Sequence, residues 1–88
     1  INTGRYADQK PGPVQDGLLR IVTEAAAFGR SLGLEVHAGH GLDYRNVLPV
    51  AARPEISELS IGYSIVARAA VVGLERAVKE MIALLERC

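Results

Sequence analysis

Residues 34–41, LEVHAGHG, decide how this chain folds. Residues 34–38 alternate between apolar and polar side chains, which is the period of a β-strand, and the run then ends in Gly39-His40-Gly41. The pattern predicts a short strand that delivers its last residues into a turn flanked by glycines. The C-terminal end of this strand is therefore expected to present His40.

Helical periodicity lies on both sides of this strand. Pro13 suits the first turn of a helix, and Gly33 supplies a stop about five turns later. Between them, apolar residues recur at helical spacing: Val14, Leu18, Ile21, Val22, Ala25, Phe28 and Leu32. After the strand, Asn46 is expected to cap a short helix that runs to Ala52.

The C-terminal half repeats the order of a strand followed by helices. A strand is expected at about residues 58–61, and it stops at Gly62. A helix at about residues 64–72 follows, Gly73 interrupts it, and residues 74–85 carry the most regular apolar stripe of the chain. At the other end, residues 1–4 resemble the end of a strand, and residues 5–13 are expected to form a surface loop.

Strands separated by helices predict parallel βα units with right-handed crossovers. This α/β order fits either an open doubly wound sheet or a closed barrel, and periodicity alone does not distinguish them. Within residues 1–88 we expect one partial domain, because two βα units and a strand end leave sheet edges without partners. Since the first residue is Ile1 and already resembles strand, we expect sequence to precede it.

Composition narrows the classes of protein. The ten basic and ten acidic residues are scattered, so neither nucleic acid nor a membrane surface is an expected partner. No apolar run approaches the ~18 residues of a membrane span. The one cysteine, Cys88, excludes an internal disulfide and a cysteine-based zinc site, and it fits a reducing, cytoplasmic location. We expect no metal site.

In parallel α/β folds the working residues gather at the C-terminal ends of the strands. Three such ends are expected here, at residues 2–4, 38–41 and 61–63, and all should lie on one face. Gly62 would let backbone approach a ligand, and the following helix N-terminus favours a phosphate. The same pattern also fits a strand that simply enters an ordinary helix.

For several side chains the sequence allows both a functional and a purely structural role. His40 between two glycines is suited to proton transfer, although an ordinary turn histidine fits the same pattern. His37 is expected to line a barrel or to be a polar core residue, and one partner histidine is too few for a metal site. Arg45 and Arg68 could assist an anion or could lie on solvated or helix-packing faces.

Three strings resemble the pyridoxine 5′-phosphate synthase family in order and spacing: residues 3–8 (TGRYAD), 31–42 (SLGLEVHAGHGL) and 59–69 (LSIGYSIVARA). The likeness runs over essentially the whole chain. It implies a (β/α)8 barrel of which this chain holds the end of the sixth strand and the seventh and eighth βα units. It also implies condensation of 1-deoxy-D-xylulose 5-phosphate with 3-amino-2-oxopropyl phosphate, without metal or organic cofactor, in an intact protein that forms homo-oligomers.

The resemblance also assigns roles to residues. His40 would be a proton donor, Gly41 would contact the phosphate of the aminoketone, and Gly62 and Tyr63 would hold the same substrate. Relatives usually carry histidine in place of Tyr63 and of Asn2. Because the family's catalytic glutamate would precede this stretch, we expect the chain alone to be inactive. The alternatives are a non-catalytic diverged half-barrel that serves as an interaction module, and another phosphate-binding barrel enzyme.

Overall fold

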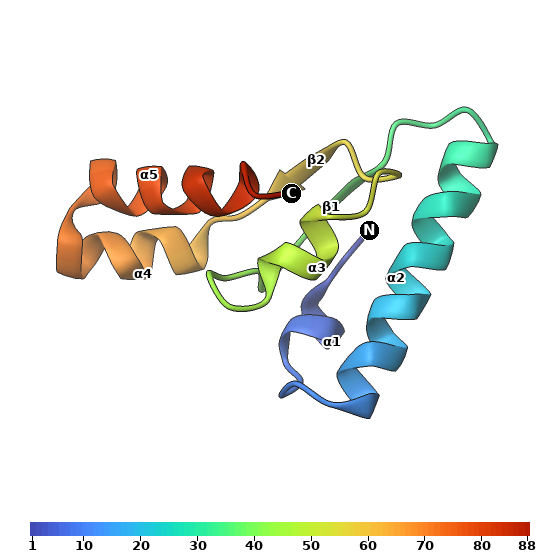
Figure 1. Cartoon of the computed structure of the whole chain (residues 1–88), viewed down its shortest axis with the longest axis horizontal. Helices are drawn as coiled ribbons and strands as arrows, with labels where there is room; N and C mark the ends of the chain where they lie inside the picture. Colours follow the sequence, from blue (N-terminus) through green and yellow to red (C-terminus); the bar gives the residue numbers. More distant parts are fainter.

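Two short parallel strands lie at the centre of the structure, a computed structural model that describes all 88 residues (Figure 1). Strand β1 (His37–Gly39) pairs with β2 (Glu58–Ser60), so that Ala38 lies opposite Leu59. Asn2 adds a parallel bridge to Gly39 on the other side of β1. The prediction that three strand ends lie side by side and point the same way is therefore confirmed.

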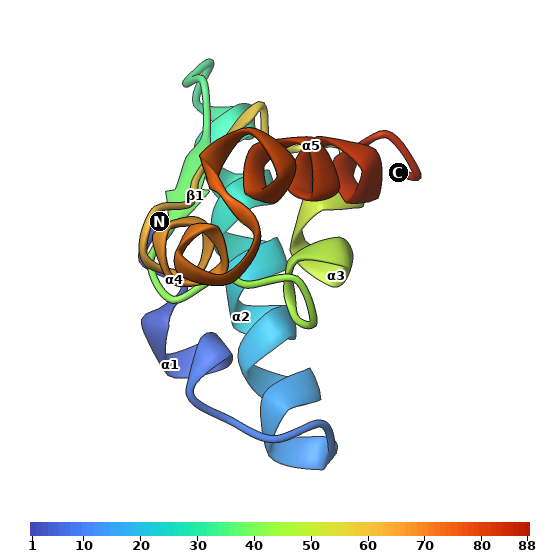
Figure 2. The ribbon, with the colours of Figure 1, turned by 90° about the vertical axis from the view of Figure 1, so that its left-hand side faces the viewer.

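Helices connect and follow these strands, with the bounds α1 (Gly4–Ala7), α2 (Pro13–Ser31), α3 (Val47–Ala51), α4 (Tyr63–Val72) and α5 (Leu74–Leu85). The four helices predicted from the sequence are α2 to α5, and each lies within two residues of its expected place. Figures 1 and 2 show α4 and α5 running antiparallel side by side, joined at Gly73, whose φ is +90°. None of these helices combines the length and apolar character that crossing a membrane requires.

The core lies on one side of the two strands. Ala38 is buried in a cluster that consists of Tyr6, Ala38, Leu42, Val47, Val50 and Met81, and Leu59 packs against it. Because neighbouring residues of a strand point to opposite faces, His37 lies on the other side. Its side chain is 51% exposed. His37 is therefore not a core residue in this chain, which corrects one of the two environments expected for it.

The expectation of a surface loop over residues 5–13 is wrong for its first part. Residues 4–7 form helix α1, closed by hydrogen bonds such as that from the Ala7 N–H to the Thr3 carbonyl, 2.9 Å. Tyr6 is 2% exposed, and its hydroxyl donates to the Asn46 carbonyl at 2.6 Å. A tyrosine that finds both an apolar pocket and a buried acceptor holds this segment against the core.

Asn46 occupies the expected N-cap position of α3, but its side chain does not cap the helix. Its Oδ1 accepts a hydrogen bond from the Asp43 N–H at 2.8 Å, and its Nδ2 donates to the Gly41 carbonyl at 3.3 Å. Asp43 in turn accepts from the N–H groups of Arg45 and Asn46. Asn46 therefore stabilises the loop after β1 rather than the N-terminus of α3.

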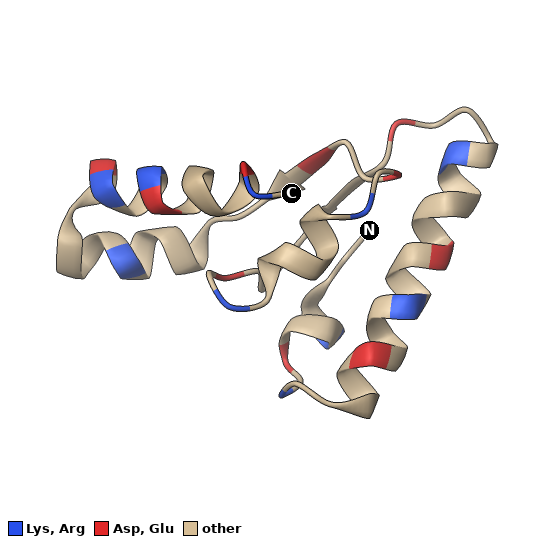
Figure 3. Cartoon of the chain, in the orientation of Figure 1, with Lys and Arg blue, Asp and Glu red and all other residues tan.

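Helix α2 is confirmed, but most of its apolar stripe is exposed. Of the seven stripe residues only Val22 is buried, and Phe28 is 66% exposed. Periodicity identifies the helix correctly, but the rest of this chain covers only part of its apolar face. Charged residues of both signs alternate along α2 and α5 (Figure 3).

Candidate functional site

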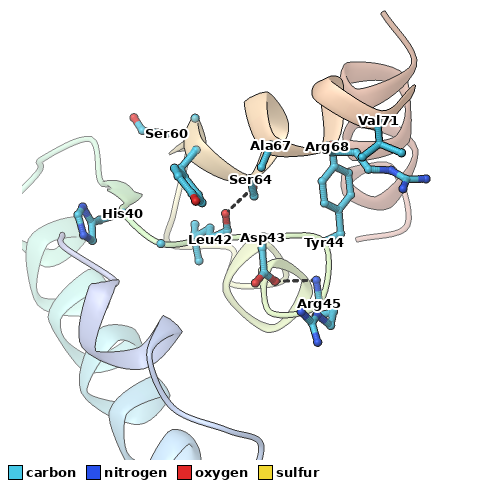
Figure 4. A pocket seen from close by; sticks show the side chains of 13 residues that line it. His40, Leu42, Asp43, Tyr44, Arg45, Ser60, Ser64, Ala67, Arg68 and Val71 are labelled. Carbon is cyan, nitrogen blue, oxygen red and sulfur yellow. Dashed lines mark hydrogen bonds between the residues drawn. The ribbon is translucent and has the colours of Figure 1, made fainter. Parts of the chain in front are cut away.

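A pocket of about 920 Å³ opens at the C-terminal ends of β1 and β2 (Figure 4). All four residues expected at the site line it, namely His40, Gly41, Gly62 and Tyr63. The loop after β1 supplies one wall, and the first turns of α4 supply the other. The structure thus brings together residues that the sequence placed at two separate strand ends.

The β1 wall of the pocket has an unusual backbone. His40 is exposed and has a φ of +93°, which makes it the only non-glycine residue with positive φ. Gly41 follows with φ +75°, and a Cβ there would lie 2.7 Å from the Cβ of Ala7. The chain itself therefore requires glycine at position 41, whether or not a substrate contacts it.

The α4 wall offers unpaired backbone donors. Gly62 is the N-cap of α4, and no side chain caps this terminus. The first N–H groups of a helix have no partner within the helix, so those of Tyr63 and its neighbours are available to a ligand. A Cβ added to Gly62 would meet nothing within 4 Å, and Tyr63 is 88% exposed. Open space therefore surrounds the start of α4.

A hydrogen bond fixes the two walls to each other. The Ser64 hydroxyl, in the first turn of α4, donates to the Leu42 carbonyl at 2.8 Å, and Figure 4 shows this link across the pocket floor. Leu42 is itself 2% exposed and part of the core. This contact could not be predicted from the sequence, because the two residues are 22 positions apart.

Arg45 and Arg68 also line the pocket, but their environments differ. Arg68 donates from Nε and Nη2 to both carboxylate oxygens of Glu80, at 2.9 and 3.1 Å. These hydrogen bonds raise the pKa of Arg68 and lower that of Glu80. Arg68 therefore joins α4 to α5 and has its charge balanced, whereas Arg45 is exposed on the rim. Of the two alternatives left open for Arg68, the structure favours helix packing.

The polar residue that sequence reasoning missed at this site is Thr3. It is fully buried, and its hydroxyl donates to the His40 carbonyl at 2.8 Å. Residues 2–4 were expected to lie on the same face as His40, but one strand end does not reveal which of its side chains turns toward the next strand. The contact joins residues 37 positions apart.

His37 lies at the other end of β1, about 10 Å along the strand from His40 at the usual rise per residue. Its Nε2 is 3.2 Å from Glu35 Oε1 and 3.7 Å from Glu58 Oε2. Ligand atoms of these three side chains lie within 4.8 Å of one another, and all three side chains are exposed. The structure separates this group from the pocket, so His37 and His40 belong to different places in the fold.

Comparisons with known proteins agree with the resemblance found in the sequence. Residues 1–87 match the model of the family described as pyridoxal phosphate biosynthesis protein PdxJ. The chain is 51% identical over 87 residues to a pyridoxine 5′-phosphate synthase of Thioalkalivibrio sulfidiphilus, with 99% of this chain and 35% of that protein covered.

Two further relatives carry the same name. The one from Parasynechococcus marenigrum is 55% identical over 86 residues, covering 98% of this chain and 34% of the relative. The one from Trichlorobacter lovleyi is 48% identical over 87 residues, covering 99% of this chain and 36% of the relative. The chain thus spans about a third of the length of the curated relatives that it matches. These matches show that the chain belongs to the PdxJ family of pyridoxal phosphate biosynthesis proteins.

Proposed function

We propose that these residues form the phosphate-holding and proton-donating part of a pyridoxine 5′-phosphate synthase. The proposed reaction condenses 1-deoxy-D-xylulose 5-phosphate with 3-amino-2-oxopropyl phosphate and releases inorganic phosphate and water. The proposal concerns the complete protein in which this stretch acts. It rests on the family membership and on the geometry of the pocket.

One observation carries the proposal: His40 and the uncapped N-terminus of α4 line the same pocket. A proton donor and an anion site can act on one substrate only if both reach it. The hydrogen bond from Ser64 to Leu42 links the two walls. The parallel pairing of β1 with β2 sets the register of the two strands, so that both walls begin at the same edge of the sheet.

The α4 terminus suits a phosphate group for two reasons. Its free N–H groups donate hydrogen bonds, and the helix dipole adds a favourable interaction of about 0.3–1 kcal/mol when exposed, rising to about 2 kcal/mol in a sheltered site. This is enough to orient a phosphate but not to bind it alone. The open space beside Gly62 allows the phosphate to approach the backbone directly.

His40 suits the proton transfers of a condensation. Loss of water requires a proton on the departing oxygen, and imidazole is the side chain that most readily supplies one near neutral pH. His40 is exposed on the rim, so its ring is accessible to a substrate whose phosphate lies at α4. Gly41, which directly follows His40, offers its backbone to the same substrate.

The core lies on only one face of the two strands, and this favours a closed barrel rather than an open doubly wound sheet. In a barrel all helices lie outside the strands, whereas a doubly wound sheet is covered on both faces. Here the core cluster lies on the face of Ala38, and His37 and Glu58 on the other face are exposed. We propose that this exposed face lines a (β/α)8 barrel, with α4 as the short phosphate-binding helix after the last strand.

The decisive experiment measures formation of pyridoxine 5′-phosphate from the two substrates by the complete natural protein that contains these residues. Replacing His40 with asparagine should lower turnover by roughly 10²–10⁴-fold, because a proton donor is lost. The matched control is His37→Asn, which changes the histidine at the start of β1, away from the pocket, and should leave turnover unaltered. Equal rates for wild type and His40→Asn would remove His40 from the mechanism.

A second candidate, a non-catalytic interaction module, is favoured only by Asn2 and Tyr63, the two positions at which the resemblance to the family implies histidine. Tyr63 is 88% exposed, so its side chain reaches no partner within the chain. Restoring histidine at both positions in the complete protein separates the candidates. A diverged module would stay without turnover, whereas a synthase would retain or increase it.

A further inference from the structure

His40 has a backbone conformation that side-chain-bearing residues rarely adopt. Its φ is +93°, and no other non-glycine residue has a positive φ. Such a conformation persists only where the surroundings impose it. The question is therefore which groups hold the two peptide planes on either side of the His40 Cα.

Both planes are held by one residue. The plane before His40 contains the Gly39 carbonyl, which accepts a hydrogen bond from the Thr3 N–H at 2.7 Å. The plane after His40 contains its own carbonyl, which accepts from the Thr3 hydroxyl at 2.8 Å. Fixing these two planes fixes both φ and ψ of the residue between them. Thr3 itself is fully buried, and its hydrogen bond to the His40 carbonyl is partly buried.

The next residue, Gly4, provides the surface on which the His40 ring lies. A Cβ added to Gly4 would be 2.7 Å from Cδ2 and 3.5 Å from Nε2 of the imidazole. The ring therefore occupies the space that any side chain at position 4 would need. The Gly4 N–H donates to the Asn2 Oδ1 at 2.7 Å, which keeps this short segment in place.

We infer that Thr3 is a positioning residue that, together with the bare Cα of Gly4, sets the backbone and ring orientation of His40. This inference rests on the proposed function of His40 and adds a residue to which no role is otherwise assigned. The Thr3 hydroxyl does not touch the substrate. It acts by removing the alternative conformations in which the ring would point away from the reacting atoms.

The test uses the complete natural protein and steady-state formation of pyridoxine 5′-phosphate. Thr3→Val keeps the shape of the side chain and removes only the hydroxyl, so kcat should fall by about 10- to 10²-fold with KM unchanged. Thr3→Ser restores the hydroxyl and should recover most of the loss. The matched control is Thr23→Val, because the Thr23 hydroxyl also donates to a backbone carbonyl, that of Leu19, but on α2.

A double variant separates positioning from general damage. In a His40→Asn background, Thr3→Val should cause no further loss of kcat, because the group that Thr3 orients is already gone. An equal fold-loss in both backgrounds would overturn the inference, as would full activity of Thr3→Val. If His40→Asn itself retains full activity, the proposed function fails, and the kinetics no longer bear on Thr3.

A crystal structure of each variant tests the inference independently of turnover. In Thr3→Val the φ of His40 should leave the positive region, or the ring should move from Gly4. An unchanged His40 would overturn the inference even if the reaction proves to be a different one. Should Thr3→Val fail to fold, Gly4→Ala supplies the second variant, since its Cβ would lie 2.7 Å from the His40 Cδ2 and 2.9 Å from the Asn2 Oδ1. It must displace the ring and lower kcat while leaving the Thr3 side chain intact.

Discussion

Tyr6→Phe removes a single hydroxyl whose role the structure defines closely. Tyr6 is 2% exposed, and its hydroxyl donates to the Asn46 carbonyl at 2.6 Å across 40 positions of sequence. Phenylalanine fills the same volume, so no cavity forms, but the buried carbonyl loses this donor. Leaving a buried acceptor without its partner costs about 1–3 kcal/mol. We expect the free energy of unfolding at pH 7 to fall by about 1–2 kcal/mol in the complete protein.

The same substitution should depend on pH in a defined direction. Burial raises the pKa of Tyr6 above 10.0, and the negative charges of Asp43 and Asp16 add to this effect. The unfolded chain therefore ionises at lower pH than the fold does. Stability from Tyr6 is complete below pH 10 and is lost as the pH rises through the folded value. The difference in stability between wild type and Tyr6→Phe should consequently shrink above pH 10.

Urea unfolding followed by circular dichroism, at pH 7 and at several values above 10, measures both effects. The control is Tyr63→Phe, which removes a hydroxyl from a side chain that is 88% exposed and should change stability by less than about 0.5 kcal/mol at pH 7. A stability difference for Tyr6→Phe that stays constant or widens with pH would contradict the assignment of Tyr6 as a neutral, buried donor.

Four further substitutions test the packing and the site. Gly39→Ala places a Cβ 2.8 Å from the Ser60 Cβ in β2 and should destabilise the protein by roughly 1–3 kcal/mol. Gly17→Ala lies in helix α2, where its Cβ meets nothing within 4 Å, and it should stabilise the protein by about 0.5–1 kcal/mol. Urea unfolding measures both changes. Glu80→Gln should be less stable than wild type at pH 7, and this difference should vanish as the pH falls below 4.5, because the hydrogen bond with Arg68 lowers the pKa of Glu80 in the fold. Gly62→Val should raise the KM for the phosphorylated aminoketone with little change in stability, and an unaltered KM would place the phosphate elsewhere.

Features that depend on neighbouring residues could be predicted from the sequence. Pro13 begins α2, and Gly33, with a φ of +80°, follows its end, because both residues act through their own backbone preferences. The strand ends at residues 38–41 and 61–63 were predicted for the same reason, and the pocket contains residues from both. Because parallel strands run in the same direction, the residues at their C-terminal ends all lie at the same edge of the sheet.

Features that depend on distant partners could not be predicted in this way. Tyr6 reads as part of a polar loop until its acceptor, 40 residues later, is known, and Thr3 gains its role only from a carbonyl 37 residues away. The exposed stripe of α2 has a related cause. Periodicity reports that one face is apolar, but not how much of that face this stretch of chain covers.

Gly41 and Gly62, the two glycines of the pocket, differ in whether the fold itself requires a glycine. Gly41 has a φ of +75°, and a Cβ there would lie 2.7 Å from Ala7, so the chain requires glycine even without a substrate. Gly62 has a negative φ, and nothing within 4 Å opposes a Cβ there, so the fold alone does not require glycine. A substitution at Gly62 therefore tests the proposed phosphate contact without a clash inside the chain, whereas any substitution of Gly41 disturbs the loop that carries His40.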